Sequence, residues 1–137
     1  MKVKIAIVIS DFNEKITSKM EKAAETQASS LNAEIVKKIH VPGAFEIPFA
    51  AKNILEKEQV DAVVALGAVI QGDTDHDIVV ANSAAAKLMD ISLHYNKPIG
   101  MGIMGPRINY EQAEERAEEY AKRAVKAAVE MLKIKNN

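Results

Sequence analysis

Apolar runs alternate with helical patterns along the whole chain, and this alternation limits the possible folds more than any other feature. Runs typical of buried strands lie at residues 3–9, 34–39, 62–69 and 98–104. Apolar positions at helical spacing follow each run, at residues 16–31, from 48 onwards, and at 78–93 and 109–134. Strict alternation predicts parallel strands joined by right-handed crossovers. We therefore expect an α/β fold, a three-layer α/β/α sandwich around a four-stranded parallel sheet.

Length and composition narrow the class of protein further. The 137 residues fit a single domain over 1–137, and a net charge of −1 argues against a nucleic-acid partner held by bulk electrostatics. The absence of cysteine excludes disulfides and thiolate chemistry. The basic and then apolar start fits a first strand better than a signal peptide, and no run reaches the ~20 apolar residues that span a bilayer. We expect no membrane partner and a cytoplasmic location.

Three strand-to-helix loops are the expected place for a ligand. In parallel α/β sheets, ligands bind beyond the carboxyl ends of the strands. Those ends lie at residues 10–13, 40–46 and 67–76. The sequence therefore selects these loops before any motif is considered.

The loop at 67–76 carries the most chemistry. Gly67 and Gly72 would let the backbone turn and approach a ligand. Thr74 is the expected N-cap of the next helix, whose N–H groups and dipole suit a phosphate. His76 would then lie in the first turn, where the dipole favours a neutral imidazole that accepts a proton. The alternative is a capped helix with an incidental surface histidine.

The other two loops are less specific. Phe12 follows a strand end and could stack on a flat heterocycle, or could equally pack as a hydrophobic staple on the next helix. Glu46 lies in a stiff loop with two prolines and could bind hydroxyl groups, although a rigid turn explains the same residues. Two histidines, His40 and His94, are isolated and are interpreted as structural. No metal-ligand spacing occurs, so we expect no metal.

The last predicted helix has two notable features. Its N-terminus has Asn109 and Gln112 at the spacing of a capping box. Arg116 could bind a phosphate with two hydrogen bonds, although a solvated charged face is the simpler interpretation. One face is rich in alanine, which predicts either a subunit contact or a close contact between helix and sheet: Ala113, Ala117, Ala121, Ala124 and Ala128.

Taken together, these segments resemble the lumazine synthase family. The resemblance covers nearly the whole chain and is most specific in the combination of residues 41–48 with 67–76. Phe12-Asn13 before Ile16-Thr17, and Gln112 to Ala117 in the last helix, also occur in the family's order and spacing. The resemblance implies a flavodoxin-like fold and a homopentamer whose active sites lie between neighbouring subunits.

The family's roles transfer by position. His76 is implied as the catalytic proton carrier. The implied substrate-binding residues are Phe12 for the uracil ring, Ala44, Phe45 and Glu46 for the ribityl chain, Ala68, Val69 and Ile70 for the pyrimidine edge, Gly72, Asp73 and Thr74 for the phosphate, Met101 over the heterocycle, and Glu115 and Arg116, with Arg116 reaching the neighbouring subunit's phosphate.

The implied reaction condenses 5-amino-6-(D-ribitylamino)uracil with 3,4-dihydroxy-2-butanone 4-phosphate to give 6,7-dimethyl-8-ribityllumazine. The substrate's own amine is the nucleophile, so the resemblance implies neither a metal nor an organic cofactor. The partners expected are these two small molecules and further copies of the chain.

The sequence also departs from the family pattern. Asp73 replaces a small residue, and its carboxylate should point away from a phosphate or cap the helix. Met101 stands where Phe is common and should pack with less stacking. The lysine usual in the last helix has no counterpart that can be assigned by position. The chain starts at the first strand, without the extra N-terminal residues of many members, which puts a closed sixty-subunit shell in doubt and leaves open a pentamer or a higher assembly.

Rival assignments remain at this point. A response-regulator receiver would need an aspartate where Gly67-Ala68 ends the third strand, and a flavodoxin would need a Ser/Thr-rich loop after the first strand. The nearer alternatives are an archaeal-type riboflavin synthase and a non-catalytic assembly protein of the same fold. The residues from Gly72 to His76 favour lumazine synthase.

Overall fold

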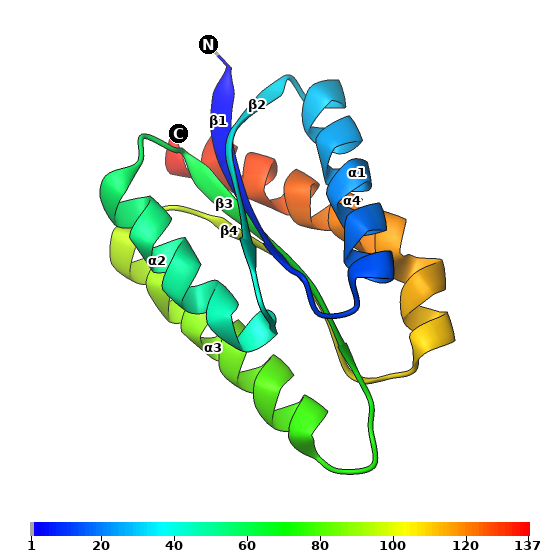
Figure 1. The fold of residues 1–137 in the computed structure, drawn as a ribbon. Helices are drawn as coiled ribbons and strands as arrows, with labels where there is room; N and C mark the ends of the chain where they lie inside the picture. The colour runs from blue at the N-terminus through cyan, green and yellow to red at the C-terminus, as the bar shows by residue number, and fades with distance from the viewer. Residues whose placement is uncertain (1) are drawn as a thin grey trace.

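The computed structural model describes residues 2–137 and confirms the predicted alternation of strands and helices (Figure 1). The elements are β1 Val3–Ser10, α1 Glu14–Ser30, β2 Ala33–Val41, the short 3₁₀ turn η1 Ala44–Glu46, α2 Ile47–Lys57, β3 Ala62–Ile70, α3 His76–Tyr95, β4 Ile99–Ile108 and α4 Tyr110–Lys135. The last strand is longer than predicted, because it continues past Met104 through Gly105-Pro106 to Ile108.

The strands form one parallel sheet in the order β2-β1-β3-β4. The step from β1 to β2 runs opposite to the later steps, so right-handed crossovers put α1 on one face and α2 and α3 on the other. The last helix, α4, lies beside α1 (Figure 1). The predicted three-layer, flavodoxin-like sandwich is therefore confirmed.

Helices on both faces explain why the central strands are apolar throughout. In β1, Ile5, Ile7 and Ile9 pack toward α1 and α4, whereas Ala6 and Val8 pack toward α2 and α3. All five side chains are fully buried. A parallel strand covered on both sides reads as a continuous apolar run, because neither face can carry polar side chains.

The alanine-rich face of α4 packs within its own subunit. The five alanines at 113, 117, 121, 124 and 128 are all buried against α1 and the sheet. The contact is close because β4 presents glycines: a Cβ on Gly100 would lie 2.1 Å from the Ala124 carbonyl oxygen, and one on Gly102 would lie 3.1 Å from the Ala124 Cβ. Of the two explanations that the sequence left open, the structure supports a close contact between helix and sheet, and a subunit contact on this face is wrong.

Two helix starts follow the predicted signals. Pro48 occupies the first turn of α2, where its missing N–H costs nothing. The capping box of α4 is formed: Gln112 N donates to Asn109 Oδ1 at 2.8 Å, and Asn109 N donates to Gln112 Oε1 at 3.0 Å.

Among residues 2–137, no helix has both the length and the apolar character that crossing a membrane requires.

The contact between Gly100 and α4 yields a stability prediction. Replacing Gly100 with Ala should lower the free energy of unfolding by about 1–3 kcal/mol, because helix and strand must separate to admit one methyl group. Urea denaturation measures this loss. Gly72→Ala is the matched control, since a Cβ at that position meets no atom within 4 Å; equal losses in the two variants would contradict the explanation.

Candidate active site

The strand order creates a crevice between the carboxyl ends of β1 and β3. The connections that follow these two strands leave on opposite faces of the sheet, which is where α/β proteins bind ligands. A cavity of about 560 Å³ lies at this point, within the usual range of small-molecule sites. The predicted site residues that line it are Phe12, Ala44, Phe45, Glu46, Ala68, Val69, Ile70 and His76.

The first loop holds an aromatic ring in the open. Asp11 N donates to Val41 O at 2.7 Å and Phe12 N donates to Pro42 O at 2.9 Å, so this loop is tied to the one after β2. Asn13, in the left-handed region at φ 65°, donates from Nδ2 to Ala68 O at 3.0 Å. The Phe12 side chain is 72% exposed and therefore does not act as a staple on α1. A rigid backbone thus presents a free ring face at the cavity.

The second loop is braced by the side chain that was expected to hold hydroxyl groups. Glu46 Oε1 accepts a hydrogen bond from Gly43 N at 2.9 Å across the 3₁₀ turn. This contact supports the rigid-turn interpretation, and it also aims the carboxylate along the cavity wall. Phe45 is 60% exposed at the same wall. Sequence reasoning did not predict the 3₁₀ turn itself.

The third loop corrects two details of the prediction. The N-cap of α3 is Asp75 and not Thr74, and the Thr74 hydroxyl accepts a hydrogen bond from His76 N at 3.3 Å. Gly67 lies inside β3, where a Cβ would be 2.8 Å from Ser10 Oγ. Glycine is therefore required there by the close packing of β3 against β1, and not by the approach of a ligand. His76 is the first residue of α3, as expected.

The three residues expected to bind a phosphate do not line the cavity. Gly72, Asp73 and Thr74 are exposed and do not line the cavity. The exposed side chain of Asp73 agrees with the expectation that it faces solvent. They belong to the connection between β3 and α3, and His76 begins the helix that follows.

Asp77 is a cavity residue whose role sequence reasoning missed. It is 5% exposed, and its Oδ2 accepts a hydrogen bond from Arg107 N at 2.9 Å. The loop's other end is bound nearby, because Gln71 N donates to Ile108 O at 2.8 Å. Both ends of the loop are therefore fastened to the end of β4. No local signal could reveal this, since the partners are 30 residues apart for Asp77 and Arg107.

Three predicted residues lie away from the cavity of their own chain. Met101 is on the edge strand β4 and is 38% exposed, and Glu115 and Arg116 are exposed on the first turns of α4. None of the three lines the cavity. Within one subunit, the structure therefore brings residues of all three loops to the cavity, and leaves out these three as well as Gly72, Asp73 and Thr74.

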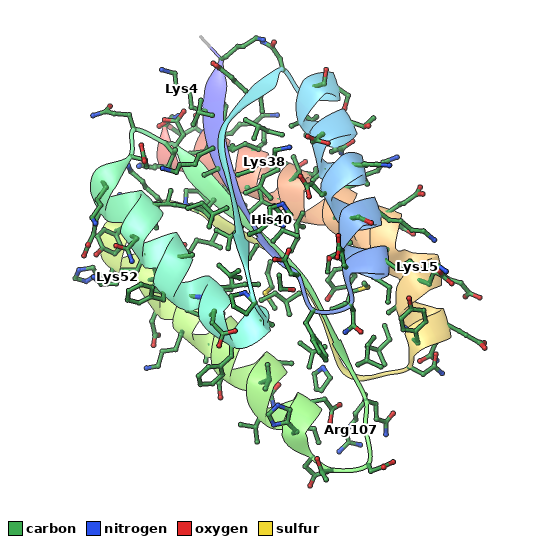
Figure 2. The ribbon with its side chains drawn as sticks, in the orientation of Figure 1. Lys4, Lys15, Lys38, His40, Lys52 and Arg107 are labelled. Carbon is green, nitrogen blue, oxygen red and sulfur yellow. The ribbon has the colours of Figure 1, made fainter. Side chains whose placement is uncertain are left out.

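Charged side chains brace the elements around the cavity. His40 Nδ1 lies 2.7 Å from Asp11 Oδ1, and its Nε2 lies 3.2 Å from Glu21 Oε1, so edge strand β2 is joined to α1 and to the first loop (Figure 2). His40 was expected to be isolated, but it contacts these two carboxylates. His94 packs edge-on against Tyr95, with ring centroids 4.8 Å apart.

A second network joins α2 to α3. Tyr95 Oη donates to Glu56 Oε1 at 2.6 Å, and the Lys52 ammonium lies 2.5 Å from the same oxygen. Hydrogen bonds from Lys52 and then Tyr95 lower the pKa of the Glu56 carboxyl below its usual value, and the Glu56 carboxylate raises the pKa of Tyr95.

Within residues 2–137, no group of three or more His, Cys, Asp or Glu side chains is placed to hold a metal ion.

Comparisons with known proteins agree on one family. The family model for 6,7-dimethyl-8-ribityllumazine synthase matches residues 2–136. A protein of that name from Archaeoglobus fulgidus is 52% identical over 132 residues, covering 96% of this chain and 92% of the relative. The chain belongs to the 6,7-dimethyl-8-ribityllumazine synthase family.

Two further relatives carry the same name. The protein from Methanocaldococcus jannaschii is 50% identical over 131 residues, covering 96% of this chain and 92% of its own. That from Pyrobaculum arsenaticum is 52% identical over 133 residues, covering 97% and 89%. The resemblance to lumazine synthases is thus confirmed, and since none of the three is named a riboflavin synthase, that alternative gains no support.

The Asp77 contact yields a second stability prediction. Asp77→Ala should lower the free energy of unfolding by about 1–3 kcal/mol, because the Arg107 N–H loses its acceptor inside the fold. Asp77→Asn keeps an acceptor oxygen and should lose less. Urea denaturation measures both, with exposed Asp73→Ala as the control. If Asp77→Ala and Asp73→Ala unfold alike, the contact does not stabilise the loop.

Proposed function

We propose that this protein is a lumazine synthase that condenses 5-amino-6-(D-ribitylamino)uracil with 3,4-dihydroxy-2-butanone 4-phosphate. The observation that carries the proposal is the cavity that Phe12, Glu46 and His76 share in a member of this family. The exposed Phe12 ring offers a face for the pyrimidine. Ala68 to Ile70 line the same cavity and would offer backbone groups to the pyrimidine edge, and Glu46, also at the cavity, would bind the ribityl chain.

The reaction needs positioning more than it needs a protein nucleophile. The primary amine of the pyrimidine attacks the ketone, and loss of water gives an imine. Elimination then expels inorganic phosphate, and attack by the ribitylamino nitrogen with loss of a second water closes the ring. Holding two reactants in one cavity removes the entropic cost of their encounter. The carbon and nitrogen atoms of the product all come from the two substrates.

His76 moves protons in this scheme. It begins α3 and lines the cavity, beside the loop in which Gly72, Asp73 and Thr74 present backbone groups to the phosphate. Proton removal beside the carbon–oxygen bond that breaks, and proton return during ring closure, are steps that an imidazole can serve. The location of His76 between cavity and phosphate loop supports this role.

The site is completed by a neighbouring subunit in a homopentamer. Met101, Glu115 and Arg116 are exposed and do not line their own cavity, which suits residues that close the cavity of the next copy. Arg116 would then meet the phosphate, with Glu115 orienting it and Met101 covering the heterocycle. Large apolar side chains left exposed on α2 and α3 support burial by further copies of the chain: Phe49, Met89 and Leu93.

The first functional prediction concerns the proton carrier. His76→Ala should lower kcat by roughly 10²-fold with little change in either KM, because only acid–base help is lost. Lumazine absorbance and fluorescence follow the reaction. His94→Ala, on the same helix but packed on Tyr95, is the control and should stay at the wild-type rate. If the unaltered protein forms lumazine no faster than the uncatalysed background, the proposed function is wrong.

The second functional prediction tests the shared site. Arg116→Ala should chiefly raise the KM for the sugar phosphate. Mixed pentamers of Arg116→Ala and His76→Ala chains should recover activity, because about one quarter of their sites would pair an intact His76 with an intact neighbouring Arg116. The two variants are co-expressed with different tags and isolated by both tags. Mixed assemblies no more active than the separate variants would contradict a site shared between neighbouring subunits.

A further inference from the structure

The loop between β3 and α3 is acidic, although it is where an anion is proposed to bind. It contains Asp73 and Asp75, Asp77 follows in the first turn of α3, and no lysine or arginine occurs between Lys57 and Lys87. Backbone N–H groups and the helix dipole supply only about half of a positive charge. Carboxylates beside a phosphate dianion repel it. A phosphate at this loop therefore requires a cation from another part of the fold.

The end of β4 brings such a cation to the loop. Arg107 N donates to Asp77 Oδ2 at 2.9 Å at one end of the loop, and Gln71 N donates to the carbonyl of Ile108 at 2.8 Å at the other. Arg107 is therefore fixed at the base of the loop by its own backbone and by that of its neighbour. Figure 2 shows its side chain extending from the end of β4 toward the connection between β3 and α3.

The guanidinium of Arg107 has no competing partner in the structure. Among residues 2–137, no carboxylate oxygen lies within 4 Å of it, and the side chain is exposed. Arginine is also an unusual choice for this backbone position, whose φ is 62°. The other non-glycine residues with positive φ are all asparagines, which tolerate that conformation at less cost: Asn13, Asn32 and Asn96. The side chain, and not the turn, accounts for an arginine here.

We propose that Arg107 is a phosphate-binding residue for the sugar-phosphate substrate and acts in the site of its own subunit. This inference rests on the proposed function and adds a cation to the one expected from a neighbouring chain. A guanidinium presents N–H groups in a planar fork that matches two phosphate oxygens. From the base of the loop it would offset the charges of Asp73 and Asp75 and select the phosphorylated sugar over the free one.

The backbone offers a variant that removes the charge and keeps the turn. Arg107→Asn places at φ 62° the residue type found at the other positive-φ positions, so the fold should be retained. We expect the KM for the sugar phosphate to rise about tenfold, with kcat and the KM for the ribitylaminouracil little changed. The inhibition constant of inorganic phosphate should rise by a similar factor. Arg107→Lys keeps the positive charge but not the planar pair of N–H groups. Its KM for the sugar phosphate should lie between those of the unaltered protein and Arg107→Asn.

The control is Lys133→Gln, which removes one positive charge from the last turn of α4. It should leave both KM values and phosphate inhibition unchanged. A thermal melt shows whether Arg107→Asn is folded. If the folded variant also leaves both KM values and phosphate inhibition unchanged, Arg107 does not bind phosphate and the inference is overturned. A lower melting temperature with unchanged phosphate inhibition also overturns the inference, because Arg107 would then stabilise the fold without binding phosphate.

Failure of this inference is separable from failure of the proposed function. Calorimetric titration with inorganic phosphate does not depend on turnover. Weaker phosphate binding by Arg107→Asn than by Lys133→Gln supports the inference even if the unaltered protein makes no lumazine. Equal binding by these variants overturns it even if the unaltered protein is an active enzyme.

Discussion

The parallel pairing of β1 with β3 is the constraint on which the rest of the structure depends. It aligns the carboxyl ends of both strands at one edge of the sheet, while right-handed crossovers send the following connections to opposite faces. The cavity is the gap left between those connections. Residues 5–9 of β1 and 62–66 of β3 are buried on both faces of the sheet. The position of the site is thus secured by the most buried part of the core.

Hydrogen bonds between loops fix the cavity walls more than any single loop does. Backbone bonds tie the first loop to the second, Asn13 ties the first loop to β3, and Asp77 ties the start of α3 to the end of β4. Such bonds leave the Phe12 ring and the His76 imidazole at the cavity with little of their backbone free to move. A preorganised site suits a reaction in which two substrates supply all the reacting groups, since placement is then the main contribution of the protein.

Sequence reasoning was most reliable where one element decides its own structure. The capping box of α4 and Pro48 in α2 need only neighbouring residues, and both predictions are confirmed. It failed where a residue's role depends on a distant partner. Asp77 was not predicted as a cavity residue, because its partner Arg107 lies 30 residues away in the chain. The small residues of α4 suited a subunit contact equally well, and only the facing glycines of β4 decided for the sheet.

The sequence by itself determined the sandwich, the three loops and the family, because apolar periodicity and short motifs are local properties that the chain carries in order. The tertiary structure alone decided which side chains share the cavity, which glycine serves packing, and that Arg107 meets the loop after β3. These facts depend on contacts between residues far apart in the chain. Their geometry is set by the pairing and twist of the whole sheet, and spacing in a linear sequence does not record it.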